Sequence, residues 1–125
     1  MKGTSGMMIR IKRAYESASE NDGYRILVDR LWPRGISKDK AKIDCWLKKL
    51  APSTKIRHWY GHDPEKWIEF KSRYFAELDA DTESLKELLG YIQKGTVTFV
   101  YSSKEQNLNN AVALREYVES LSSRR

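Results

Sequence analysis

The sequence predicts an α/β fold, in which a small, largely parallel sheet and its flanking helices form a single-domain layered sandwich. Two apolar segments, residues 26–28 and 96–101, have the composition of strands buried on both faces. Segments with helical periodicity lie between them and after them, and this order favours parallel strands. At 125 residues the chain has the length of one domain. We expect that domain to span residues 8–121, with a flexible leader or non-native remnant at 1–7 and a frayed end at 122–125.

The first part of the chain is predicted to contain two strands and a short helix. Residues 8–13 alternate apolar and basic side chains, as a half-buried strand does. A polar loop over residues 16–23, with at most one helical turn, leads into the first buried strand. Pro33 and Gly35 end that strand, because neither residue suits a central strand. Ser37 then fits the N-cap of a short helix.

Residues 43–50 fit two structures. Their apolar side chains fall on a helical stripe, although the same residues could include a short strand. We favour the helix. Pro52 interrupts the chain, and Ser53 fits the N-cap of a further short helix that Gly61 ends.

The second half is predicted to be mostly helical. Asp63 followed by Pro64 is typical of a helix start. Asp81 is expected to cap the next helix and Gly95 to end it. After the second buried strand and a loop over residues 102–107, a final apolar stripe predicts a C-terminal helix. The helix after Pro64 carries an aromatic stripe that indicates core packing, formed by Trp67, Phe70, Tyr74 and Leu78.

Composition narrows the class of protein. The net charge is +6, and residues 24–60 hold ten Lys or Arg against three Asp. This basic first half favours an anionic partner. A single cysteine, Cys45, excludes an internal disulfide, which agrees with a reducing compartment. No apolar run approaches the ~18 residues of a membrane helix, and the N-terminus lacks the apolar region of a signal peptide. We therefore expect a cytoplasmic protein that engages no membrane.

The candidate site lies where the two buried strands end, because ligands of parallel sheets gather beyond the carboxyl ends of the strands. There, guanidinium groups can grip a phosphate or carboxylate, and an indole can stack on a ring. A following helix with free N–H groups would add attraction for an anion. If both strand ends point the same way, they form one cationic, hydroxyl-lined cleft. The proposed ligand-binding residues are Arg30, Trp32, Arg34, Ser102, Ser103 and Lys104.

Each of these residues also has a purely structural interpretation. Arg30 could pair with Asp29 or with a helix carboxylate and hold the loop, and Trp32 could pack beneath it. His62 is the candidate catalytic acid or base. Because His58 and His62 are the only histidines and Cys45 the only cysteine, we expect no metal site and no cofactor.

The stretch from Asp22 to Gly35, Asp-Gly-Tyr-Arg-Ile-Leu-Val-Asp-Arg-Leu-Trp-Pro-Arg-Gly, resembles the signature of the YeaO-like family, which is classed under a domain of unknown function, the 488 group. Residues 51–54, 59–62, 70–78 and 100–104 fit the same family, so the resemblance covers nearly the whole chain from about Met8. The resemblance itself implies no activity.

The wider group to which the family is related carries Cys, Glu and Cys-His-Arg-type residues after the strand that corresponds to residues 96–101. This chain has Ser102, Ser103 and residues 107–110 there, without a thiol or an imidazole. The resemblance therefore does not extend to the thiol, metal or redox chemistry of that group.

Three functions are compatible with the sequence. The favoured one is the binding of a small anionic ligand, bearing phosphate or carboxylate, by a binding protein or an enzyme. The second is nucleic-acid binding by the basic first half, although no helix-turn-helix or RNA-recognition signature is present. The third is the binding of an acidic protein partner. The aromatic residues that interleave with the basic ones, and could stack on bases, are Trp32, Trp46, Trp59 and Tyr60.

Overall fold

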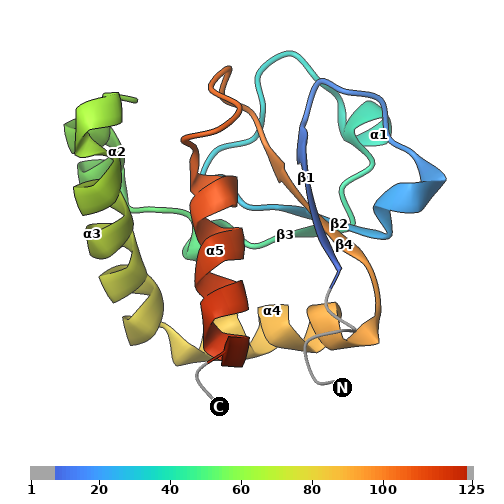
Figure 1. Cartoon of the computed structure of the whole chain (residues 1–125). Helices are drawn as coiled ribbons and strands as arrows, with labels where there is room; N and C mark the ends of the chain where they lie inside the picture. Colours follow the sequence, from blue (N-terminus) through green and yellow to red (C-terminus); the bar gives the residue numbers. More distant parts are fainter. Residues whose placement is uncertain (1–7, 124–125) are drawn as a thin grey trace.

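The computed structural model describes residues 8–123, and a four-stranded sheet lies at its centre (Figure 1). Every pairing in the sheet is parallel, so the predicted α/β sandwich is confirmed. The expected leader at 1–7 and the last two residues of the expected frayed end lie outside the described residues. Among the residues described, no helix is long and apolar enough to cross a membrane. The strands, in their order across the sheet, are β1 (Ile9–Arg13), β4 (Val97–Tyr101), β2 (Tyr24–Leu27) and β3 (Cys45–Trp46).

Within residues 8–123, five α-helices surround the sheet. In Figure 1, α5 stands between the strands and the pair formed by α2 and α3, and α4 runs below the beginnings of the strands. Three short 3-10 turns, η2 (Glu20–Asp22), η3 (Lys48–Leu50) and η4 (Pro64–Lys66), complete the helical content. The α-helices are α1 (Lys38–Ala41), α2 (Thr54–Tyr60), α3 (Trp67–Ala80), α4 (Thr82–Lys94) and α5 (Asn110–Ser123).

Side chains cap the helices where the sequence predicted. The Ser37, Ser53 and Asp81 side chains accept hydrogen bonds from the first turns of α1, α2 and α4. Asp63 caps the turn η4, which leads directly into α3. Gly61 ends α2 in the left-handed conformation, with φ of 52°, where a residue without a Cβ pays no steric penalty.

The prediction of a helix over residues 43–50 is wrong. Cys45 and Trp46 form the edge strand β3 beside β2, and the 3-10 turn η3 follows. The open edge of β2 supplies the reason: the backbone N–H of Leu47 donates to the carbonyl of Leu27 at 3.0 Å. Polar backbone groups at a buried edge need partners, and the pairing with β2 satisfies them better than one or two turns of isolated helix.

The sheet is buried on both faces, as the continuous apolar runs predicted. Ile26 and Phe99 face the large core formed with α3, α4 and α5. Leu27 and Val100, which point to the opposite face, are both fully buried in a smaller cluster. Trp32 and Ile43, from the connection that contains α1, and Trp46 of β3 pack against this smaller cluster.

Candidate functional site

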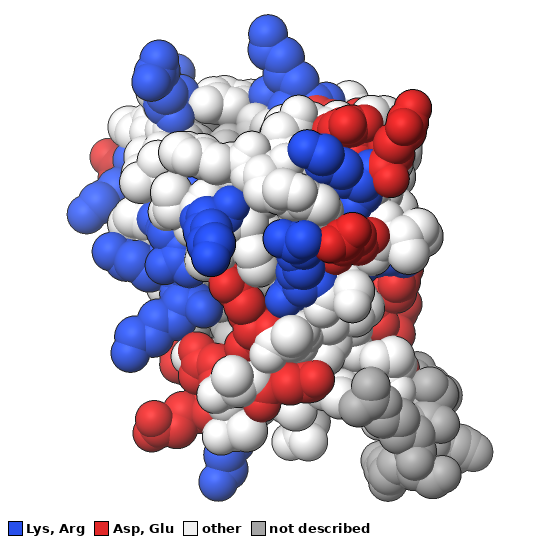
Figure 2. Space-filling model, turned by 90° about the vertical axis from the view of Figure 1, so that its left-hand side faces the viewer, with Lys and Arg blue, Asp and Glu red and all other residues white. Residues whose placement is uncertain are grey.

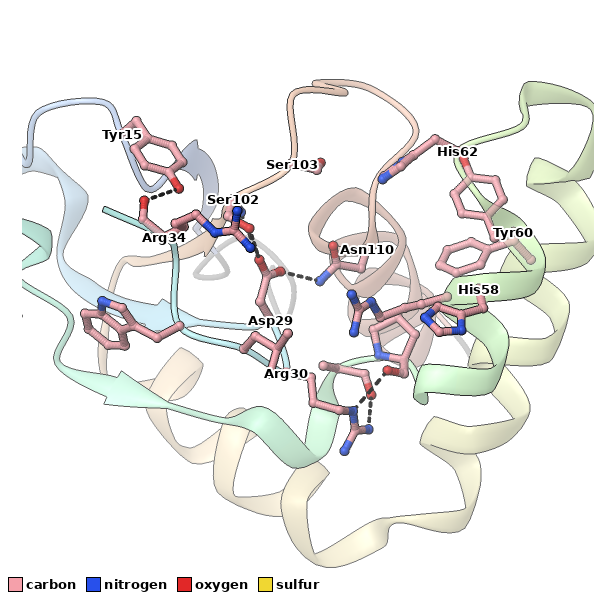
Figure 3. A pocket seen from close by; sticks show the side chains of 16 residues that line it. Tyr15, Asp29, Arg30, Arg34, His58, Tyr60, His62, Ser102, Ser103 and Asn110 are labelled. Atoms are coloured by element: carbon pink, nitrogen blue, oxygen red, sulfur yellow. Dashed lines mark hydrogen bonds between the residues drawn. The ribbon is translucent and has the colours of Figure 1, made fainter. Parts of the chain in front are cut away.

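A pocket of about 440 Å³ opens at the carboxyl edge of the sheet. Because β2 and β4 are parallel neighbours, the residues that follow them emerge together, and α2 supplies the facing wall (Figure 3). The strand ends that carry Arg30 and Arg34 and those that carry Ser102 and Ser103 therefore share one hollow. The polar side chains that line it are Tyr15, Asp29, Arg30, Arg34, Arg57, His58, Tyr60, His62, Ser102, Ser103 and Asn110.

Asp29 lies between Ser102 and Asn110 in this pocket (Figure 3). Its Oδ2 accepts hydrogen bonds from the backbone N–H of Ser102 at 2.9 Å and from the Ser102 hydroxyl at 2.7 Å. Its Oδ1 accepts from the Asn110 side-chain amide at 3.0 Å. One carboxylate thus ties together the segments that follow β2 and β4 and the first residue of α5.

The other charged groups of the pocket are basic. Asp29 is the only acidic residue among its lining residues, whereas three arginines and two histidines line it. Arg34 and Arg57 are exposed, and within residues 8–123 their guanidinium groups form no hydrogen bond or ion pair to another side chain. Two guanidinium groups therefore remain available to a ligand.

The guanidinium of Arg30 has a structural role. It donates to the backbone carbonyl of Ala51 at 3.0 Å and to that of Pro52 at 3.3 Å, and Figure 3 shows it turned towards this segment. Arg30 therefore holds the turn that precedes α2. It does not pair with Asp29, which was the structural alternative suggested by the sequence.

Trp32 lines the pocket, but its indole is engaged internally. Its Nε1–H donates to the carbonyl of Ile36 at 2.8 Å, and its ring meets that of Trp46 edge to face, with the centroids 5.6 Å apart. This matches the packing interpretation of Trp32.

Lys104 is the one proposed ligand-binding residue that is not among the lining residues. It is exposed, and a loop separates it from α5, which begins at Asn110. The Asn109 side chain accepts a hydrogen bond from the Val112 N–H at 3.0 Å. One N–H of the first turn of α5 is thus engaged by the neighbouring Asn109, and the helix does not begin directly after Lys104.

His62 does line the pocket, in an uncommon backbone conformation. Its φ is 58°, directly after Gly61, and histidine is among the residues that adopt this region more often than most. Figure 3 shows His62 across the pocket from Asp29, with Ser103 nearby on the facing loop. Its ring centroid is 5.6 Å from that of Tyr60.

Two titratable groups near His62 have shifted pKa values. Burial raises the pKa of Tyr60 to about 12, helped by the nearby carboxylates of Glu105 and Asp63, so its hydroxyl stays protonated and donates to the Leu108 carbonyl at 2.8 Å. The backbone N–H groups of Leu108 and Asn107 donate to Glu105 and lower its pKa. Glu105 is thus a fixed negative charge outside the pocket lining.

Sequence reasoning missed several lining residues. Asp29 directly follows a buried strand, which is a signal that could have identified it, yet the sequence suggested it only as a partner for Arg30. Tyr15 follows β1 in the same way. Arg57 and Tyr60 come from α2, and only the tertiary arrangement brings that helix to the strand ends.

The residues 8–123 include no group of three or more His, Cys, Asp or Glu side chains placed to hold a metal ion. Asp29, His58 and His62 all line the pocket but do not form such a group. The polar side chains that line the pocket carry guanidinium, imidazole, carboxylate, amide and hydroxyl groups.

Comparison with known proteins identifies relatives over most of the chain. The family DUF488-N3i, described as the inactive DUF488-N3 subclade, matches residues 8–125. The uncharacterised protein YeaO of Escherichia coli K12 is 40% identical over 115 residues, which are 92% of this chain and all of that protein. The uncharacterised protein Rv3073c of Mycobacterium tuberculosis H37Rv is 41% identical over 108 residues, 86% of this chain and 91% of that one. No solved structure gives a significant match.

Proposed function

This chain belongs to the YeaO-like DUF488 family, and we propose that it binds a small anionic ligand, bearing phosphate or carboxylate, in the pocket at the carboxyl edge of the sheet. The observation that carries the proposal is the pair of unengaged guanidinium groups, Arg34 and Arg57, beside a pocket with a single carboxylate. Guanidinium groups bind phosphate and carboxylate through paired hydrogen bonds. The volume of about 440 Å³ is within the range of small-molecule sites.

The proposed role is binding, with no catalytic step. Neither His58 nor His62 forms a hydrogen bond to Ser102 or Ser103, so neither of these two serines is paired with a histidine base. The Ser102 hydroxyl instead donates to Asp29, and this bond connects the segments that follow β2 and β4. The description of the family as an inactive subclade agrees with a binding role. His62, the candidate acid or base, would then offer the ligand a ring N–H donor.

The surface charge supports attraction of an anion. Figure 2 views the side of the molecule formed by α2 and α3. Lys and Arg side chains gather at the top and along one flank, whereas Asp and Glu lie on the opposite flank and below. Such an uneven field raises the rate at which an anionic ligand arrives.

A small ligand is favoured over a nucleic acid because the aromatic residues expected to stack on bases are engaged internally. The Trp46 Nε1–H donates to the Asp29 carbonyl at 2.7 Å. The Trp59 ring has the Lys66 ammonium 5.1 Å from its centroid and the Arg73 guanidinium at 4.1 Å, and Tyr60 is buried. Stacking of single-stranded bases requires an accessible ring face.

The test is calorimetric titration of the protein with inorganic phosphate and with simple phosphomonoesters at low ionic strength. We expect Arg34→Ala and Arg57→Ala each to weaken binding about tenfold, because each loses a charge-assisted hydrogen bond. Lys86→Ala is the matched control, since it removes one positive charge from the exposed side of α4, away from the pocket. Equal affinities in all four proteins, or no binding of any phosphate by the wild type, would contradict the proposal.

A further inference from the structure

The hydroxyl groups of the pocket already donate to protein atoms. The Ser102 hydroxyl donates to Asp29 at 2.7 Å and the Ser103 hydroxyl to the Glu105 carbonyl at 3.2 Å. The Tyr15 hydroxyl donates to the Arg34 carbonyl at 2.7 Å, and Tyr60 donates to Leu108. Each hydroxyl carries one hydrogen, so all four can offer a ligand only their oxygen lone pairs.

The Asn110 amide behaves in the same way. Its two hydrogens are used by the Val28 carbonyl and by Asp29 Oδ1, each at 3.0 Å. Its own Oδ1 receives no hydrogen bond from another described residue. Asp29 accepts three hydrogen bonds, whereas a carboxylate has about four lone-pair positions, so it can accept one more. Around Asp29 the side chains therefore present acceptors, whereas Arg34, Arg57 and the imidazoles are donors of the pocket without a hydrogen-bond partner among the described residues.

An anionic group alone does not fit such a surface. A phosphate dianion carries only acceptors, so next to Asp29, Ser102 and Asn110 it would leave their lone pairs unpaired, which is costly where water is excluded. The complementary ligand must bring hydrogen-bond donors to this end of the pocket. An ammonium group is disfavoured as that donor, because three arginines line the same pocket and like charges repel in a site of low dielectric. Neutral hydroxyl groups remain.

We propose that the ligand is a phosphorylated polyol. Its anionic group binds Arg34 and Arg57, and its hydroxyl groups donate to the Asp29 carboxylate, the Ser102 hydroxyl oxygen and the side-chain Oδ1 of Asn110. This proposal rests on the anion-binding function proposed above. It assigns Asp29 as the residue that distinguishes hydroxylated phosphates from plain ones. It also reverses the expectation that the serine hydroxyls donate to an anion, because their hydrogens point to protein acceptors.

The test compares three phosphomonoesters of similar size by calorimetric titration at constant pH and ionic strength: propyl phosphate without a hydroxyl, glycerol 3-phosphate with two, and phosphoethanolamine with an ammonium group. Inorganic phosphate serves as the reference anion. We expect glycerol 3-phosphate to bind about tenfold more tightly than propyl phosphate, from one added hydrogen bond to a charged acceptor. Phosphoethanolamine is expected to bind no better than propyl phosphate.

Ser102→Ala probes the acceptor surface while keeping the bond between the Ser102 backbone and Asp29. The substitution removes one acceptor and returns a lone pair of Asp29 to the pocket. The ratio of the affinities for glycerol 3-phosphate and propyl phosphate should therefore change, whereas Lys86→Ala should leave this ratio at its wild-type value. Circular dichroism verifies that both variants are folded. A loss of stability alone would move all affinities together and leave their ratio intact.

The possible failures can be told apart. If inorganic phosphate and propyl phosphate bind and glycerol 3-phosphate gains nothing, the polyol proposal is overturned and anion binding stands. If phosphoethanolamine binds most tightly, Asp29 recognises a cation and the proposal is again overturned. If no phosphate binds, both proposals fail together.

Discussion

Asp29 and Ser102 are joined by two hydrogen bonds to the same carboxylate oxygen, one from the backbone N–H at 2.9 Å and one from the hydroxyl at 2.7 Å. They lie 73 positions apart in the chain, and each follows one of two neighbouring parallel strands. The pair therefore fixes how the segments after β2 and β4 leave the sheet. Since Arg34 and Ser103 belong to those segments, the geometry of the whole pocket depends on this contact.

We expect Ser102→Ala to lower the free energy of unfolding by about 1–2 kcal/mol, because a hydroxyl bonded to a carboxylate is lost while the backbone bond remains. Ser103→Ala is the matched control. Its hydroxyl donates to a neutral carbonyl at 3.2 Å, so its loss should cost less, about 0.5 kcal/mol. Urea denaturation measures both, and equal effects would show that the Asp29 bond contributes little.

Arg30 and Arg57 line the same pocket but should respond differently to truncation. Arg30→Ala removes the donors to the Ala51 and Pro52 carbonyls, and we expect it to destabilise the fold by about 2 kcal/mol, as for hydrogen bonds from a charged group. Arg57→Ala should leave the denaturation midpoint near that of the wild type, because Arg57 is exposed and unengaged within the described residues. The opposite order of stabilities would reverse the roles assigned to these residues.

Local signals predicted the parts of this fold that depend on local physics. The caps at Ser53 and Asp81 depend on a side chain within three residues of the N–H that it accepts from. The apolar run that ends in Tyr101 is buried in every residue of β4, as expected of a strand covered on both faces. Such features need no knowledge of distant parts of the chain.

The parts that sequence reasoning missed depend on long-range contacts. The apolar residues of 43–50 do fall at helical spacing, but Cys45 and Trp46 pair with the otherwise free edge of β2 and form a strand. The sequence made a shared hollow conditional on both strand ends pointing the same way, and the parallel pairing of β2 and β4 meets that condition. Arg57 reaches the hollow from α2, which no local pattern indicates. The Ser102 hydroxyl donates its hydrogen to Asp29, which leaves only its oxygen lone pairs for the pocket. This direction depends on a partner 73 positions away and is not visible in the local sequence.

Gly23 occupies a position that has no room for a side chain. Its φ is 65°, and a Cβ placed on it would lie 2.1 Å from the Thr96 carbonyl oxygen, the same oxygen that accepts from the Tyr24 N–H at 3.0 Å. We expect Gly23→Ala to destabilise the protein by more than about 2 kcal/mol, from strain and displacement at the start of β2. Thermal or urea denaturation measures the loss.

Gly90→Ala is the control for this substitution. Gly90 lies within α4, and a Cβ there would meet nothing within 4 Å. Alanine is the better helix former, so we expect it to stabilise the protein by about 0.5–1 kcal/mol. If both substitutions destabilised the protein equally, the close approach of Gly23 to Thr96 would not be the cause.

Asp22 should make stability depend on pH in the acid range. It is fully buried, and its carboxylate contacts Arg25 at 2.7 Å and Lys12 at 3.2 Å. Burial raises the pKa of Asp22, but the Ser19 N–H, Lys12 and Arg25 together lower it by more than burial raises it. The pKa of Asp22 is therefore below its ordinary value. A carboxyl group whose pKa is lower in the folded than in the unfolded protein stabilises the fold above its unfolded pKa, and this contribution is lost as the pH falls through the folded value.

We therefore expect Asp22→Asn to be less stable than the wild type by about 3–5 kcal/mol at pH 7, because it leaves the buried Arg25 without its counter-charge. The difference should shrink below about pH 4, where the Asp22 carboxyl of the unfolded protein takes up a proton while that of the folded protein stays ionised. Urea denaturation between pH 3 and pH 7 follows both proteins. Glu69→Gln breaks the exposed pair with Arg73 and should change stability by less than about 1 kcal/mol at either pH. Curves for Asp22→Asn and wild type that stay parallel over this range would show that the buried carboxylate is not the source of the acid sensitivity.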